Sequence, residues 1–136
     1  MTATGPDLAV ARAVAARRYE DLLVWKLADE LRRCVHRSTD SAAFRQQQWL
    51  QGQLRRAAHS ACANVAEGFG RYKPKDFARF VRTARGSLEE TKAHLDQVQL
   101  LGLVGDSEVH EIRSLANRAC AAATKLIRYL ENAEEP

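Results

Sequence analysis

Apolar positions recur at steps of three and four residues along four long segments of the chain, and this spacing predicts four amphipathic helices. The segments that carry the pattern are residues 19–38, 45–67, 75–102 and 106–132. The third is the most regular, because Phe77, Ala84, Thr91 and Val98 step by seven, as in a coiled-coil seam. No segment alternates apolar and polar residues with a period of two, so no sheet is expected.

Three short breaks separate these segments, at residues 38–41, 68–74 and 102–105. Short connections make consecutive helices antiparallel neighbours. We therefore expect an all-α protein, an antiparallel up-down-up-down four-helix bundle over residues 19–132. Residues 1–18 are expected to form an N-terminal arm, flexible or partly helical, and residues 133–136 a frayed tail. Gly68 is expected to end the second helix as a left-handed cap residue.

Length and composition describe an ordinary globular domain. The chain has 136 residues, of which 46% are hydrophobic and 28% charged. No apolar run approaches the roughly 20 residues that span a bilayer, and the N-terminal residues lack the pattern of a secretory signal. We therefore expect a cytoplasmic protein. The three cysteines are odd in number and no pair has CxxC spacing, so they are expected to be reduced core residues.

Catalytic and metal-binding motifs are not found in the sequence. It contains no nucleophile elbow, Walker loop or HExxH motif. The di-iron pattern of helix bundles, Glu-x-x-His on two helices, is also absent. Glu90/His94 and Asp106/His110 are four residues apart and are interpreted as exposed polar pairs. We therefore expect a non-catalytic protein without cofactor or metal.

Polar residues interrupt the apolar stripes of the second and third segments. These residues are Ser60, Asn64, Glu67, Ser87 and Glu90. The first hypothesis is a buried hydrogen-bonded network between the two helices, joined by Arg71; the alternative is a ligand pocket. Gly86 lies inside a helix at a cost of about 1 kcal/mol relative to alanine. We therefore expect its backbone to face a neighbouring helix closely, at Ala57 or Ala61.

Basic residues gather around the break between the second and third segments. The candidates for phosphate contacts are Arg71, Lys73, Lys75, Arg79 and Arg82, with Arg55 and Arg56 as further candidates. Phe69 and Tyr72 lie beside them and would offer aromatic faces for stacking. The net charge of +4 and a pI of about 9.2 permit nucleic-acid binding without requiring it. The alternative is a solvated face with ion pairs to acidic neighbours, and the residues alone favour this alternative.

Several strings of residues together resemble a known family. The strings are Tyr19-Glu20-Asp21-Leu22, Gln53-Leu54-Arg55-Arg56-Ala57-Ala58, Asn64-Val65-Ala66-Glu67-Gly68 with Gly70-Arg71, and Phe77 and Phe80 followed by Gly86-Ser87-Leu88. They resemble the 23S rRNA intervening sequence proteins of bacteria from Tyr19 to about Asn132. One departure is Ala61-Cys62, where the family usually has isoleucine and proline.

The resemblance implies properties that the spacing of residues does not show. The family fold is an antiparallel four-helix bundle, and its members are similar to the accessory proteins of diversity-generating retroelements. Both types form homopentameric barrels, and the accessory proteins bind nucleic acid and a reverse transcriptase. The first hypothesis is therefore a homopentameric scaffold that binds RNA or DNA through its basic surface.

Two other functions remain open. The second hypothesis is a protein–protein interaction module without direct nucleic-acid binding, in which Trp25 or Trp49 anchors a partner. The third is a small-ligand or metal-binding bundle that uses Asn64, Glu67 and Glu90.

Overall fold

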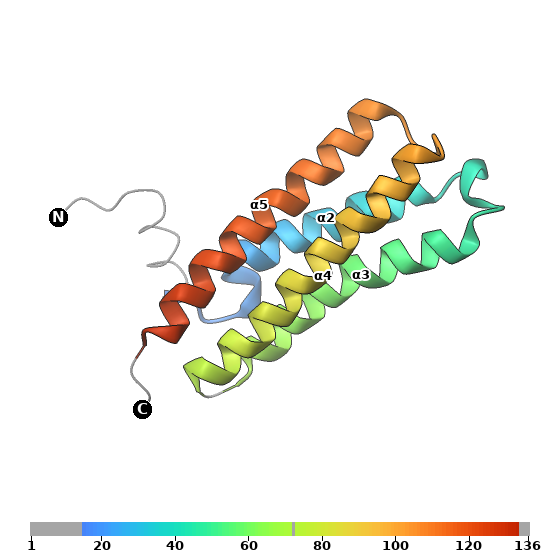
Figure 1. Ribbon diagram of the computed structural model, residues 1–136. Helices are drawn as coiled ribbons and strands as arrows, with labels where there is room; N and C mark the ends of the chain where they lie inside the picture. Colours follow the sequence, from blue (N-terminus) through green and yellow to red (C-terminus); the bar gives the residue numbers. More distant parts are fainter. Residues whose placement is uncertain (1–14, 72, 134–136) are drawn as a thin grey trace.

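The computed structural model describes residues 15–71 and 73–133. Within these residues the chain forms four long helices, α2 (Leu23–Thr39), α3 (Gln48–Phe69), α4 (Pro74–Leu100) and α5 (Asp106–Glu131). Two short 3-10 helices, η1 (Tyr19–Asp21) and η2 (Ala42–Phe44), precede α2 and α3. Figure 1 shows that successive helices run in opposite directions. The predicted all-α four-helix bundle is confirmed; the predictions made for residues 1–14, Tyr72 and residues 134–136 lie outside the described residues.

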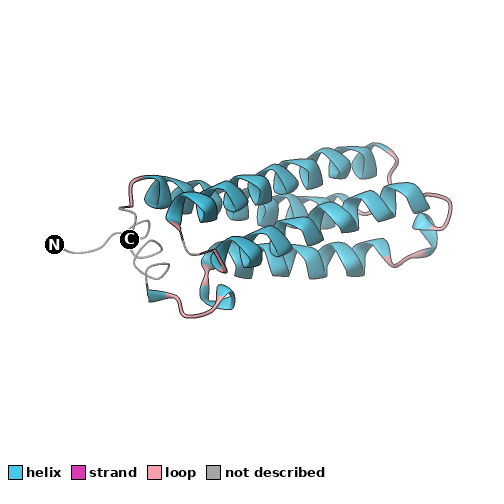
Figure 2. Ribbon diagram, turned by 90° about the horizontal axis from the view of Figure 1, so that it is seen from below, coloured by secondary structure: helices cyan, strands magenta, loops and turns pink. Residues whose placement is uncertain are grey.

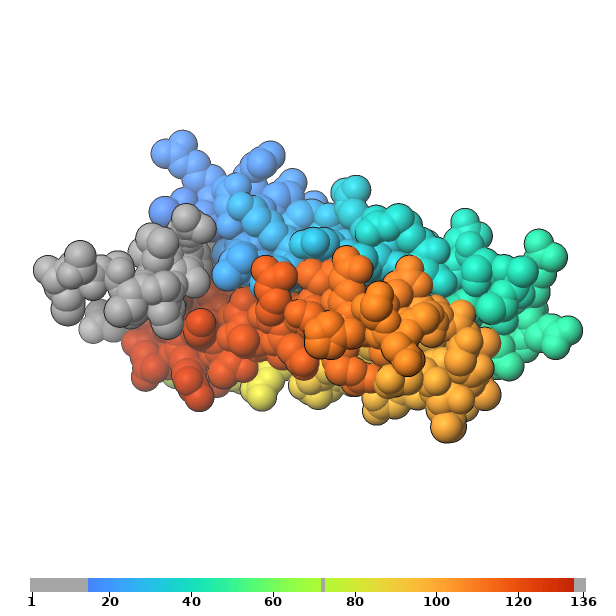
Figure 3. Space-filling view, turned by 90° about the horizontal axis from the view of Figure 1, so that it is seen from above, coloured from blue at the N-terminus to red at the C-terminus, as the bar shows by residue number. Residues whose placement is uncertain are grey.

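The four helices pack in a closed square. α3 contacts α2 and α4, and α5 contacts α4 and α2. Short loops join the helices at the two ends of the bundle, as Figure 2 shows. In Figure 3 the surfaces of α2 and α5, which are the first and last long helices, lie side by side along the molecule. No helix in the described ranges combines the length and the apolar character needed to cross a membrane.

The apolar stripes of the four helices meet along the bundle axis. The large side chains that are fully buried include Leu31, Val35, Leu54, Val65, Val81, Leu88, Leu95 and Ile112. Burial of each such side chain stabilises the fold by about 1.5–3 kcal/mol. Thr91, which steps by seven from Ala84 and Val98, is also buried, and its hydroxyl donates a hydrogen bond to the Ser87 carbonyl at 2.8 Å. The heptad pattern therefore identified the core face of α4.

A glycine permits a close approach between α3 and α4, but it is not the glycine that the sequence suggested. A Cβ atom added at Gly68 would lie 2.7 Å from the Phe80 Cβ and 2.9 Å from the Phe77 Cδ1. Gly86 is exposed, and a Cβ there would meet nothing within 4 Å. The prediction that Gly86 faces a helix is therefore wrong, because Gly86 lies on the solvent side of α4.

Gly68 also does not end its helix. α3 continues through it to Phe69, and Gly70 follows with a φ of −73°. Among the described residues, the glycine with a positive φ is Gly102, at 63°, just after α4. The prediction of a left-handed cap at Gly68 is therefore wrong, because this position serves the packing of α3 on α4.

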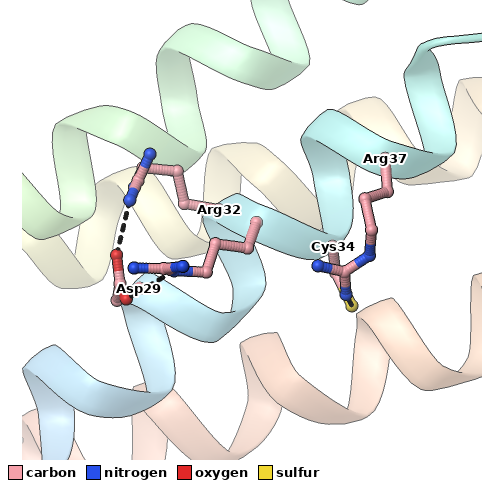
Figure 4. A network of polar contacts seen from close by, with 5 residues as sticks. Asp29, Arg32, Cys34 and Arg37 are labelled. Carbon is pink, nitrogen blue, oxygen red and sulfur yellow. Dashed lines mark hydrogen bonds and ion pairs between the residues drawn. The ribbon is translucent and has the colours of Figure 1, made fainter.

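Asp29 is a charged residue on the buried side of α2. The sequence places it off the apolar stripe, yet only 9% of it is exposed. Its carboxylate accepts hydrogen bonds from Arg32 at 2.6 Å and from Arg33 at 2.9 Å, both on the same helix. Figure 4 shows the Asp29 carboxylate beside the guanidinium of Arg32. Burial raises the pKa of Asp29, but the two arginines outweigh this effect and lower the pKa below its ordinary value.

Candidate nucleic-acid interface

The basic residues predicted to contact phosphates lie at one end of the bundle, where α3 passes to α4. Pro74 begins α4, and Lys73 before it has the extended backbone of a helix cap. Proline suits the first position of a helix because its missing N–H would have no partner there. The positive end of the α4 dipole therefore lies beside Lys73 and Lys75. We call Arg71, Lys73, Lys75, Arg79 and Arg82 the basic end of the molecule.

Phe80 organises two of these cations. The guanidinium carbon of Arg71 lies 4.7 Å from the centroid of the Phe80 ring, and that of Arg79 lies 5.1 Å away. Each contact is a cation–π interaction that contributes about 0.5–1 kcal/mol at an exposed site. The structure thus brings together arginines from α4 and from the turn before it. This role of Phe80 was not predicted, although an aromatic residue directly after Arg79 on a basic helix face is a usable signal.

Each arginine of the basic end also has an acidic neighbour. Arg71 pairs with Glu67 at 3.1 Å, and Arg79 approaches Asp76 at 3.9 Å. Arg82 forms an ion pair with Glu131 at the end of α5. All these side chains are about half exposed, and exposed ion pairs contribute only about 0.2–1 kcal/mol. The carboxylates of Glu67, Asp76 and Glu131 therefore hold these arginines only weakly, and they offset part of the positive charge at this end.

Arg55 and Arg56 lie far from the basic end. Arg55 lies about 21 Å, at the rise of an α-helix, before the end of α3 at Phe69, and Arg71 lies beyond that end. The Nε of Arg55 donates to the Thr39 hydroxyl at 2.8 Å, and its guanidinium reaches the His36 carbonyl at 3.3 Å. Arg55 therefore donates hydrogen bonds to oxygen atoms at the end of α2, whereas Arg56 donates a hydrogen bond to Gln53 on its own helix. The structure does not join these two residues to the other five.

A family model described as 23S rRNA-intervening sequence protein matches residues 20–125. The chain belongs to this family. No curated protein matches the chain. All five residues of the basic end of this 23S rRNA-intervening sequence protein lie within the matched range. Glu131, the partner of Arg82, lies beyond that range. At Ala61-Cys62, where the resemblance departs from the usual residues, α3 continues without interruption.

The predicted polar network forms only in part. The Ser87 hydroxyl donates to the Ser60 hydroxyl at 2.9 Å and links α4 to α3. The Asn64 amide donates to the carbonyl of Ser60 at 2.9 Å and to its hydroxyl at 3.1 Å. Glu67 and Glu90 are exposed: Glu67 pairs with Arg71 just past the end of α3, and Glu90 pairs with His94 on α4. The structure therefore does not bring Asn64, Glu67 and Glu90 together as the ligand-binding hypothesis requires.

Phe69, predicted as a stacking residue, packs against the core and against Phe77 instead. Its ring meets the Phe77 ring edge-on, with centroids 6.1 Å apart. It is half-buried against the core cluster at this end of the bundle. Phe69 therefore supports the turn between α3 and α4 rather than offering a free face to a base.

The three cysteines are buried and unbridged. Burial raises the pKa of the Cys62 and Cys120 thiols to about 11 and also raises that of Cys34. A protonated thiol is a poor nucleophile and a poor metal ligand. Arg37 donates a hydrogen bond to the Cys34 sulfur at 3.3 Å, as Figure 4 shows. These thiols therefore behave as small core residues.

Proposed function

We propose that this 23S rRNA-intervening sequence protein is a non-catalytic, homopentameric scaffold that binds RNA or DNA through its basic end. The observation that carries the proposal is the convergence of Arg71 and Arg79 on Phe80, beside Lys73 and Lys75. Two guanidiniums held by one ring are already oriented, so less side-chain entropy is lost when a phosphate binds. The pentameric assembly and a reverse-transcriptase partner come from the family resemblance alone, and a cytoplasmic location is part of the same proposal.

Phosphate contacts of this kind give affinity without sequence preference. Binding should therefore weaken steeply as salt rises, because each neutralised phosphate releases counterions. Assembly of several copies would place several basic ends on one particle and raise the affinity for a long nucleic acid further.

The test is fluorescence anisotropy of the nuclease-treated protein with a labelled structured RNA, at low and at near-physiological salt. The variant Arg79→Glu/Arg82→Glu reverses two charges of the basic end. We expect it to lose most of the affinity and to lower the slope of log K against log salt by about two. The matched control, Arg45→Glu/Arg118→Glu, reverses two exposed charges elsewhere and should bind almost as the parent protein does. Equal binding by both double variants would refute the assignment of the basic end.

A second candidate function is supported by Trp49. This side chain is 72% exposed, at the start of α3, with its ring edge-on to His94 at 6.3 Å. Exposed tryptophan is a frequent anchor of protein interfaces. Under this hypothesis a protein partner should remain bound to the parent protein after nuclease treatment and be lost from Trp49→Ala. Retention of the partner by Trp49→Ala would count against a role of this residue.

A further inference from the structure

A depression between α2 and α3 opens near the basic end. It has a volume of about 340 Å³ and is lined mainly by apolar and small side chains, with three polar ones at its edge. Tyr19 and Trp25 form one wall, with ring centroids 5.3 Å apart and planes at 61°. Both rings keep exposed surface, because Tyr19 is 36% exposed and Trp25 is half-buried.

The depression exists because α3 offers only small residues opposite the aromatic wall. Cys62, Ala63 and Ala66 line its α3 side. Ala63 is exposed and Ala66 half-buried, so the short side chains of α3 leave the depression open beside the half-buried Trp25. A tryptophan or tyrosine ring with one open face is a platform on which another planar group can stack.

The charge at this site is fixed by the buried carboxylate of Asp29. Asp29 and Arg32 both line the depression, and Asp29 holds Arg32 and Arg33 at 2.6 and 2.9 Å. Asp29 and Arg32 balance each other in the lining, and the exposed Arg33, which also pairs with Asp29, adds one net positive charge beside the depression. The ion pair with Asp29 orients the Arg32 guanidinium (Figure 4), and Arg32 lines the same depression as Tyr19 and Trp25. His59 lies on the α3 side of the same edge.

The depression and the basic end are neighbours along the axis of α3. Ala66 lines the depression, and α3 ends three residues later, at Phe69, just before Arg71. An open aromatic face beside a positively charged track is the arrangement by which proteins bind single strands.

We propose that this depression binds one unstacked base of a single-stranded nucleic acid, stacked on Trp25, with Arg32 facing the adjoining phosphate. The inference rests on the proposed nucleic-acid binding and narrows it to single-stranded substrates. A base in a duplex is stacked and paired and does not reach such a site. The net positive charge beside the depression favours this occupant over a second copy of the chain, since the centres of protein interfaces are depleted in charge.

The experiment uses the fact that the chain has two tryptophans, Trp25 and Trp49. The variant Trp49→Phe changes an exposed residue and leaves Trp25 as the fluorescent reporter. It is titrated with a short single-stranded oligonucleotide and with an abasic strand of the same length and charge. We expect the normal strand to quench Trp25 and to bind about tenfold more tightly than the abasic strand. The matched control Trp25→Phe keeps an aromatic ring but reports from Trp49, and its fluorescence should not change on binding.

The other possible results of this titration distinguish the base site from the basic end. If the two strands bind equally and leave Trp25 unchanged, while Arg79→Glu/Arg82→Glu still removes binding, the base site is refuted and the basic end stands. If neither strand binds even at low salt, both proposals fail. If acrylamide loses access to Trp25 as the protein concentration rises, before any strand is added, a second copy covers the depression and the base site is refuted.

Discussion

Replacing Gly68 by alanine tests whether the close approach of α3 and α4 controls stability. The added Cβ would lie 2.7 Å from the Phe80 Cβ and 3.2 Å from the Phe77 carbonyl oxygen. Neither atom is the far end of a flexible side chain, so the two helices must move apart. Overpacking of this kind costs about 1–3 kcal/mol. We place the cost near the upper value, about 3 kcal/mol, because the clash involves backbone and Cβ atoms.

Gly86→Ala is the matched control, because this glycine lies inside α4 with open space around it. Alanine in an exposed helix position is favoured over glycine by about 1 kcal/mol. Gly86→Ala should therefore stabilise the fold by about that amount. Gly68→Ala gains the same helix propensity and should still lose about 2 kcal/mol in total. The difference between the two variants thus isolates the overpacking cost.

Urea unfolding at one fixed protein concentration measures both variants. With a slope of about 2 kcal/mol per molar urea, the two midpoints should differ by about 1.5 M. The slope itself should stay the same, since the same surface is exposed on unfolding. Equal midpoints for Gly68→Ala and Gly86→Ala would refute the reasoning, because they would show that α3 and α4 adjust to the extra carbon without cost.

Three further predictions concern other contacts. Arg55→Met should lower the free energy of unfolding by about 1–2 kcal/mol in the same urea assay, because it removes the hydrogen bonds to the end of α2, whereas Arg56→Met should change it by less than about 0.5 kcal/mol. The pKa of Asp29 is lower in the folded protein than in the unfolded chain, where it is about 3.9. The ionised carboxylate therefore stabilises the fold above this unfolded pKa, and the stabilisation is lost as the pH falls through the lower folded pKa. Asp29→Asn should therefore destabilise the protein at pH 7 and flatten the dependence of stability on pH below about 4; an unchanged slope there would contradict the pairing. Cys62, with a thiol pKa of about 11, should not react with a disulfide reagent at pH 8 until the protein is unfolded, and rapid reaction of the native protein would contradict its burial.

The number and the position of the helices follow from the sequence. Burying one face of a helix requires apolar residues at steps of three and four, and each helix shows this spacing in its own residues. The predicted third segment ended within two residues of α4, and the predicted fourth began where α5 begins. The first helix starts later than predicted, at Leu23, because residues 19–21 form a 3-10 turn instead. Such ends depend on local hydrogen bonds that an apolar period does not encode.

The contacts between helices could not be predicted in the same way. Gly68 and Gly86 are both glycines within long helices, and the sequence does not distinguish them. Only the rotation of α3 and α4 about their axes decides which one faces a neighbouring helix. The same rotation places Ser60 against Ser87 and leaves Glu67 in solvent. The aromatic depression was missed because its two walls come from different helices.

The closed square of helices has a consequence for the order of folding. Three of its four sides join helices that follow one another in the chain, so their contacts need only short loops to close. The fourth side joins α2 to α5, and at least 66 residues lie between Thr39 and Asp106. Closing that long loop costs more chain entropy, so we expect this side to form after the transition state. Substitutions between α2 and α5 should then accelerate unfolding, whereas those between α3 and α4 should slow folding.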